Sequence, residues 1–265
     1  MFINTISESK YQTFKQCQLK YRYRYVERLP EPEEANTEAL QFGSYIHKVL
    51  EDGVDAKSCE DLVKIAEQVR PSYKVSEKYA GKDLTCFQNF FEFNAKLGES
   101  LATELVFEVP LKGDITLNGI IDRVIKGDKG GYLIIDYKTS KREKTKTELF
   151  QDSQLKGYVY AICNMYGVKP QDVVAAHYYP LTGNFVHLTY SPAQISAHVN
   201  KVVDEVWKIR KKKKEDFVSM RNDFCNWCAY KGACPEFNDQ ATCTKKIDEL
   251  KERKKMLNEQ KKNKK

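Results

Sequence analysis

A short glycine-rich turn between two apolar segments is the feature that most constrains this fold. Apolar and polar residues alternate from residue 115 to 125, and three glycines then fall within residues 127–131. Residues 132–138 resume a strand-like run rich in Ile and Tyr. This pattern predicts two antiparallel strands joined by a hairpin turn.

The predicted hairpin brings three charged side chains together. Asp122 and Asp136 are each seven residues from the middle of the loop, so they face each other in the simplest register. Lys138 shares a face with Asp136, because side chains alternate along a strand. Two close carboxylates suit Mg²⁺ or Mn²⁺, and a lysine beside that metal could orient water and offset charge on a phosphate. The trio predicts phosphodiester hydrolysis.

The ordinary alternative is an exposed strand that carries a solvated salt bridge. The apolar run 133–135 argues against that alternative, because it places Asp136 at the rim of a core, where a carboxylate needs a partner.

The segments around these residues resemble the RecB-like branch of the PD-(D/E)XK nuclease superfamily, over most of the chain. Residues 119–123 are similar to the first acidic motif of that branch, and residues 135–139 to its Asp-Tyr-Lys-Thr signature. Gln154 and Tyr158 match its Gln-x-x-x-Tyr motif, within a helical pattern from about residue 146 to 165. Four residues apart, they share a helix face and could contact DNA phosphate and support the catalytic lysine. A capped, packed helix is the alternative.

Residues 43–47, Gly-Ser-Tyr-Ile-His, resemble a Gly-x-x-x-His helix of the same branch, in which the histidine reaches the metal. The resemblance implies that His47 is a further ligand, and imidazole nitrogen suits Mn²⁺ better than Mg²⁺. A half-buried helix histidine is the alternative. Glu104 and Glu108, on a predicted strand before the hairpin, are candidates for one more carboxylate.

Eight cysteines occur without a signal-peptide pattern, so we expect a cytoplasmic protein whose thiols bind metal rather than form disulfides. Cys225, Cys228 and Cys234 form a compact C-x2-C-x5-C loop. The resemblance supplies a fourth ligand, Cys17. In iron-sulfur members of the branch, which include AddB and the CRISPR-associated exonucleases, one N-terminal and three C-terminal cysteines hold a 4Fe-4S cluster. Such members commonly follow the first cysteine with proline, where this chain has Gln18. Zn²⁺ is the alternative metal, because four thiolates suit it equally well.

Length predicts a single domain, and the resemblance implies that it is a nuclease domain over residues 1–243, with a helical insertion at about 55–101 and the cysteine cluster at 17 and 225–234. Ten Lys or Arg against four Asp or Glu give residues 245–265 a net charge of +6, out of +7 for the whole chain. We therefore expect residues 244–265 to be a basic tail, partly helical or disordered. No apolar run approaches the ~20 residues of a membrane helix, so we expect a soluble protein without membrane contact.

The expected elements alternate between helices and strands. They are helices to about residue 101, strands at 103–111, 115–126 and 131–138, a helix at 146–166, strands at 172–180 and 184–190, and then helices. This order favours an α/β fold. The resemblance implies a restriction-endonuclease-like mixed central sheet flanked by helices, with the N- and C-terminal helical segments clasped by the iron-sulfur cluster.

Together these features predict a metal-dependent DNA nuclease, an exonuclease acting on single-stranded DNA or DNA ends. The alternative is a DNA-binding or processing subunit of a larger assembly, with a helicase, a recombination protein or a CRISPR adaptation protein as partner and the nuclease site secondary. The sequence contains no Walker-type ATP-binding loop, so a motor of that kind would be a separate protein.

Overall fold

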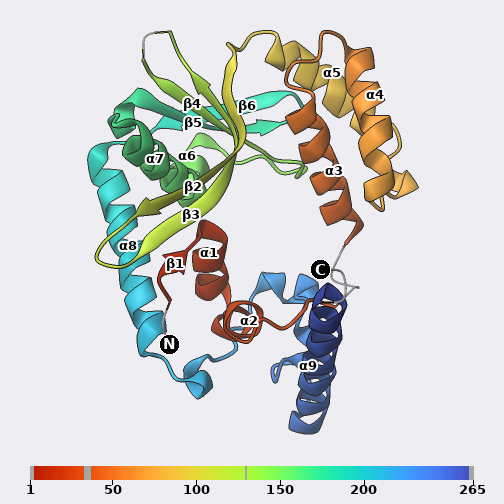
Figure 1. The fold of residues 1–265 in the computed structure, drawn as a ribbon, viewed down its shortest axis with the longest axis vertical. Helices are drawn as coiled ribbons and strands as arrows, with labels where there is room; N and C mark the ends of the chain where they lie inside the picture. The colour runs from red at the N-terminus through yellow and green to blue at the C-terminus, as the bar shows by residue number, and fades with distance from the viewer. Residues whose placement is uncertain (1–2, 33–36, 129, 263–265) are drawn as a thin grey trace. The chain divides into compact units, whose positions relative to one another are not determined.

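The computed structural model describes residues 3–32, 37–128 and 130–262, and the chain forms two compact units (Figure 1). The sheet unit comprises residues 4–8 and 38–204. The terminal unit comprises residues 1–3, 9–37 and 205–265.

Six strands form one mixed sheet in the sheet unit. They are β1 Thr5–Ile6, β2 Ser100–Pro110, β3 Thr116–Lys126, β4 Tyr132–Tyr137, β5 Val173–Tyr179 and β6 Asn184–Thr189. The order is β1-β3-β4-β5-β6, with β2 also paired to β3. β1 runs parallel to β3 and β4 parallel to β5, while the other pairs are antiparallel. This confirms the expected α/β fold with a mixed sheet; the short strand β1 was not expected.

Helices lie at different sides of this sheet (Figure 1). Their bounds are α3 Glu38–Asp52, α4 Cys59–Val69, α5 Lys82–Asn94, α6 Lys146–Phe150, α7 Ser153–Tyr166 and α8 Pro192–Lys211, whose last turns belong to the terminal unit. The first three bury an aromatic-rich cluster, including Phe42, Phe90 and Tyr137, against the sheet. α7 packs across β2, β3, β4 and β5. Burial of these apolar faces, more than helix propensity, holds the layers together.

The predicted hairpin is present. Arg123 pairs with Ile135 and Lys126 with Tyr132, in the register that places Asp122 opposite Asp136. Gly130 in the turn has φ +89°, a conformation that glycine adopts without strain. The backbone ladder ends at the Arg123–Ile135 pair, and the Asp122 carboxylate instead accepts a hydrogen bond from the Tyr137 N–H at 2.7 Å.

Two expected helices are interrupted, which corrects the sequence interpretation. The helix expected over residues 146–166 breaks at Asp152, whose carboxylate accepts from the Leu155 N–H at 2.9 Å and caps α7. Aspartate favours such a cap because its oxygen satisfies an N–H left open by the first turn. The first of the helices expected before residue 101, over residues 7–27, breaks at Cys17, which has extended backbone angles (φ −161°, ψ 116°). Periodicity continues across both breaks, so the sequence pattern does not reveal them.

The terminal unit is built mainly from helical segments. They are α1 Glu8–Gln16, which begins in the sheet unit, α2 Gln18–Tyr21, a π-helical turn Arg22–Val26, 3-10 turns at Lys214–Asp216, Asp223–Trp227 and Lys231–Ala233, and α9 Gln240–Lys262. The expected basic tail thus lies within α9 as far as residue 262. Leu19, Tyr23, Tyr230 and Leu250 form a small core beside the cysteine loop. Among the described helices, none combines the length and apolar composition that crossing a bilayer requires.

Candidate active site

One pocket in the sheet unit collects the charged residues of the hairpin. It has a volume of about 590 Å³ and lies between α3, the strands β2, β3 and β4, and the start of α7. Its charged and amide lining comprises His47, Lys48, Glu51, Glu104, Asp122, Asp136, Lys138 and Gln154. Glu108, the other carboxylate considered, is exposed on β2 and does not line this pocket.

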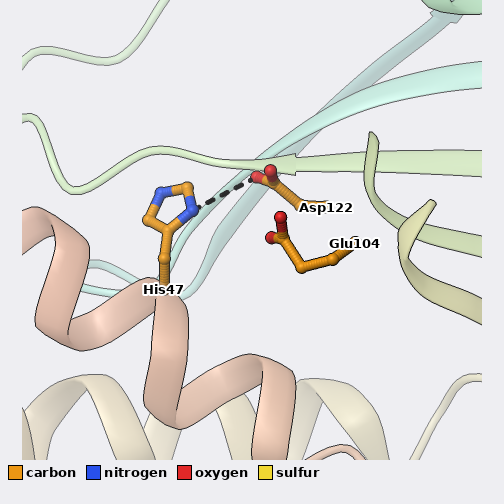
Figure 2. A group of neighbouring side chains, drawn as sticks. All are labelled: His47, Glu104 and Asp122. Atoms are coloured by element: carbon orange, nitrogen blue, oxygen red, sulfur yellow. Dashed lines mark ion pairs between the residues drawn. The ribbon is translucent and has the colours of Figure 1, made fainter. Parts of the chain in front are cut away.

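Three of these residues could hold a metal ion (Figure 2). One ligand atom each from His47, Glu104 and Asp122 lies within 4.8 Å of the other two. His47 Nδ1 is 3.5 Å from Asp122 Oδ2. The side chains come from α3, β2 and β3, so segments far apart in sequence converge here. One imidazole nitrogen and two carboxylates form a donor set suited to Mn²⁺ or Mg²⁺.

Glu104 has a backbone conformation that is unusual for a residue with a side chain. Its φ is +47°, in the left-handed region, where a residue with a side chain costs about 1–3 kcal/mol. The flanking ladder pairs, Thr103–Arg123 and Leu105–Ile121, put Glu104 level with Asp122. Strain at a carboxylate that faces two other ligand groups is what a functional site would retain.

The electrostatics of the three groups favour a bound cation. Burial, together with the nearby Asp136, raises the pKa of Asp122 well above its usual range. Burial also lowers the pKa of His47, which keeps the imidazole neutral and able to donate its lone pair to a metal. Crowded carboxylates are stable as anions only when a positive charge lies among them.

Asp136 and Lys138 form the second part of the pocket. Asp136 is 2% exposed, and its Oδ2 lies 2.5 Å from Lys138 Nζ. Lys138 Nζ donates to Gln154 Oε1 at 3.1 Å, and Gln154 Nε2 donates to the Tyr158 hydroxyl at 2.7 Å. The shared helix face expected for Gln154 and Tyr158 is therefore present, and Gln154 contacts the lysine.

Lys138 is held as an ammonium ion. Burial acts to lower its pKa, but the surrounding carboxylates, Asp136 first and then Asp122 and Asp152, together outweigh burial and raise it. A lysine in this state donates hydrogen bonds and offsets negative charge, and it is a poor base toward water.

A buried histidine beside Asp136 was missed in the sequence. His177 on β5 is directly opposite Asp136 in the parallel β4–β5 register and is fully buried. Its Nε2 lies 3.5 Å from Asp136 Oδ2 and 3.8 Å from Asp152 Oδ2, and Lys144 holds Asp152 in turn. Burial lowers the pKa of His177 to about 4, so the ring is neutral near pH 7. The available signal was a histidine within an otherwise apolar predicted strand.

A glycine lets α3 reach the pocket. A Cβ at Gly43 would lie 3.0 Å from Thr139 Oγ1, tighter than most real contacts. Glycine at this position therefore permits close approach of α3 to the chain after β4, and His47 follows one turn later. This gives a physical reason for the Gly-x-x-x-His spacing.

The four candidate cluster cysteines lie around one cavity in the terminal unit. Cys17, Cys225, Cys228 and Cys234 all line a cavity of about 30 Å³. All four are free thiols, and burial raises the pKa of Cys228 and Cys234. Cys243, the next cysteine along the chain, is buried and does not belong to this lining.

The fold and the pocket define a class of protein: an α/β protein with a mixed sheet, in which a strand hairpin presents two aspartates and a lysine beside a histidine from a helix. Residues 5–235 match the PD-(D/E)XK nuclease superfamily, and the chain belongs to this superfamily.

Curated relatives are distant and much longer. The chain is similar to a subunit of the ATP-dependent helicase/deoxyribonuclease of Streptococcus uberis, with 26% identity over 174 residues, covering 60% of this chain and 16% of that protein. The protein of the same name from Streptococcus agalactiae serotype Ia is 26% identical over 180 residues, again covering 16% of its length. The chain thus spans 16% of the length of these relatives.

Among solved structures, a protein from Eubacterium rectale, provisionally called an exonuclease, matches with a TM-score of 0.52 at 15% identity. The match covers 85% of this chain and 87% of that one. It shows a shared fold.

Proposed function

We propose that this protein is a metal-dependent deoxyribonuclease, an exonuclease acting on single-stranded DNA or DNA ends. The observation that most supports this is the pocket in which ligand atoms of His47, Glu104 and Asp122 lie within 4.8 Å of one another. The ion-paired Asp136 and Lys138 line the same pocket. DNA as substrate is supported by the deoxyribonuclease name of the curated relatives, and end-directed cleavage by the description of the Eubacterium rectale protein.

The donor set fits Mg²⁺ or Mn²⁺. His47, Glu104 and Asp122 would hold the ion, and Asp136, in the same pocket, would contribute its second carboxylate oxygen. When bound, such an ion polarises a phosphate oxygen and acidifies water.

The chain's own residues would then position the attacking water and neutralise negative charge on the phosphate. Lys138 donates hydrogen bonds to the attacking water or to a phosphate oxygen and offsets the charge that gathers there. Gln154 fixes the lysine at 3.1 Å, and Tyr158 fixes Gln154 at 2.7 Å. The lysine therefore needs little reorganisation when substrate arrives.

A direct test uses end-labelled single- and double-stranded DNA with Mg²⁺, Mn²⁺ or EDTA. Wild type should cleave only with metal, and the position of the label gives the polarity of digestion. Asp122→Asn and Lys138→Gln should abolish cleavage, whereas Glu108→Gln, on the same strand as Glu104 but outside the pocket, should retain it. Cleavage by Asp122→Asn at the wild-type rate would refute the assignment.

We also propose that Cys17, Cys225, Cys228 and Cys234 hold a 4Fe-4S cluster, with Zn²⁺ as the alternative. Support comes from the shared cavity and from thiols whose raised pKa values mean that a cation must stabilise the thiolate form. Such a clasp closes a loop of roughly two hundred residues, worth about 5 kcal/mol in a chain-entropy picture.

Anaerobic purification with iron, sulfide and zinc analysis distinguishes the two metals. Cys228→Ser should remove the metal and lower the melting temperature, whereas Cys163→Ser, outside the cavity, should retain the metal. Equal metal content in the two variants would contradict the cysteine assignment.

The second candidate is a DNA-binding or processing subunit of a larger assembly. It is favoured by the similarity to one subunit of an ATP-dependent helicase/deoxyribonuclease. Stable copurification with a helicase, a recombination protein or a CRISPR adaptation protein, with the isolated chain inert but bound to DNA, would support it. A cytoplasmic location stays a prediction.

A further inference from the structure

Positive charge is concentrated in one of the two units. The terminal unit carries 24 Lys or Arg against 14 Asp or Glu, a net charge of +10, which leaves −3 for the sheet unit. The candidate active site therefore lies in the unit whose net charge is negative. Since phosphate contacts supply most of the affinity for nucleic acid, a surface that binds a nucleic-acid strand is expected on the terminal unit.

An exposed row of large apolar side chains lies on the same unit. Val218, Met220, Phe224 and Trp227, here called the apolar strip, are 57%, 41%, 60% and 71% exposed. Such a concentration within ten residues is unusual on a protein surface and marks a binding site. Two of the four are aromatic, and the segment lies beside the cysteine cavity, which Met220 and Phe224 also line.

Two grooves meet at Met220 of this strip; Val218 lines one, Phe224 lines the other, and Trp227 lies outside both linings. One, of about 870 Å³, is lined by Lys15, Lys208, Lys211 and Lys212 together with Val218 and Met220. The other, of about 510 Å³, is lined by Lys15, Met220, Arg221 and Phe224 among others. Lys15 and Met220 belong to both, so the grooves form one track with apolar and basic groups side by side.

The acidic residues of the track leave its positive character intact. Glu205 lies between Lys15, at 3.5 Å, and Lys208, at 3.0 Å, so two lysines outweigh one carboxylate. Asp216 caps its own 3-10 turn by accepting from the Lys213 N–H at 2.7 Å. Glu215 is the remaining carboxylate in the lining.

We propose that this track binds single-stranded nucleic acid, with bases against the apolar strip and phosphates on Lys15, Lys211, Lys212 and Arg221. Exposed aromatic side chains beside lysines are the combination that holds single strands, because every base has a face that stacks on a ring while cations follow the backbone. A duplex presents no free base faces and would use only the lysines. The track and the active-site pocket have no lining residue in common, and the inference rests on the proposed function only for DNA as the strand that it holds.

The test measures binding without cleavage. Full-length protein in EDTA is titrated into fluorescent oligo-dT of about 20 nucleotides, and anisotropy gives the affinity. Phe224→Ala combined with Trp227→Ala should weaken binding by roughly tenfold or more. Lys211→Glu combined with Lys212→Glu should weaken binding and reduce the salt slope by about 1.4.

Matched controls separate the track from general basicity. Lys261→Glu combined with Lys262→Glu makes the same charge change near the end of α9 and should have a much smaller effect. Phe150→Ala removes an aromatic side chain that is 42% exposed in the sheet unit and should have none. Equal loss from the two lysine pairs would overturn the proposal.

A base-free strand tests stacking directly. Wild type should bind an abasic oligonucleotide of the same length more weakly than oligo-dT, and the aromatic double variant should lose this preference. A variant with Trp227→Phe, which keeps an aromatic ring, should bind oligo-dT more tightly than the aromatic double variant. Equal binding of both strands by the wild type, or no binding of either, would refute the track. An unchanged melting temperature and metal content in each variant exclude a fold defect. If the alanine double variant fails to fold, Phe224→Leu combined with Trp227→Leu replaces it.

Failure of the track and failure of the nuclease are distinguishable. Hydrolysis of a thymidine 5′-(p-nitrophenyl phosphate) needs only the active-site pocket, so it should persist in the track variants. If the wild type lacks this hydrolysis yet binds oligo-dT through the strip, the nuclease proposal fails and the track stands.

Discussion

Replacing His177 by leucine should weaken metal binding while leaving the fold as stable as before. His177 Nε2 lies 3.5 Å from Asp136 Oδ2 and, within the described residues, makes no hydrogen bond. A buried polar group in this state costs about 1–3 kcal/mol, which leucine removes. The substitution also breaks the contact between His177 Nδ1 and the Tyr179 hydroxyl at 3.3 Å, worth about 0.5–1.5 kcal/mol. The two effects nearly cancel, so the melting temperature should stay level or rise by a few degrees.

The effect on the metal has the opposite sign. We expect His177 to help fix Asp136 through the polar contact, at 3.5 Å, between its neutral ring and the oxygen that faces Lys138. Groups that orient a metal ligand typically contribute 10–100-fold in metal affinity, or about 1.4–2.7 kcal/mol. We expect the Mn²⁺ concentration for half-maximal cleavage, and the dissociation constant from calorimetry without DNA, to rise by about this factor. His177→Gln, which keeps an N–H donor, should recover part of it.

A second buried histidine provides the control. His198 Nε2 lies 2.6 Å from Glu8 Oε1, and both side chains are buried in the sheet unit away from the pocket lining. His198→Leu leaves a buried carboxylate without this partner and should cost about 3–5 kcal/mol of stability with no change in metal affinity. Unaltered Mn²⁺ dependence in His177→Leu, or a loss of stability as large as that of His198→Leu, would show that His177 is a packing residue only.

Three further outcomes are expected. Glu104→Gly should raise the melting temperature of the metal-free protein, because glycine accepts φ +47° without strain. It should also reduce the increase in melting temperature that Mn²⁺ produces. Glu108→Gly should have neither effect. Gly43→Val should lower cleavage at least about tenfold by displacing α3 and His47, with Gly43→Ala intermediate, and equal activity would refute the close-approach argument. The raised pKa of Asp122 means that the folded, metal-free protein binds a proton more readily than the unfolded chain, so the stability contributed by this group grows as pH falls. The same protons compete with metal for the carboxylate. Calorimetry from about pH 8 to about pH 6 should therefore show weaker Mn²⁺ binding at the lower pH.

The sequence by itself determined the local parts of this protein. A glycine turn between two alternating segments fixes a hairpin and its register, so Asp122 opposite Asp136 could be predicted from spacing alone. Helical spacing likewise put Gln154 and Tyr158 on one face. These predictions succeeded because each depends on residues that are neighbours along the chain or across a tight turn.

Only the tertiary structure decided which side chains meet those local elements. His177 reaches Asp136 through the parallel pairing of β4 with β5. Parallel strands are joined by a long connection, so no short turn fixes their register in the sequence. Glu104 and Glu108 were both candidates from the sequence, and only the structure places Glu104 in the pocket and Glu108 outside it. Glu104 has a left-handed backbone angle inside a strand, a conformation that strand propensity disfavours and that surrounding contacts must impose. The break at Asp152 goes with its side-chain cap of α7, and the break at Cys17 with an extended backbone; helical periodicity reveals neither. Periodicity reports which face of an element is buried, while the chemistry of the pocket depends on contacts between elements.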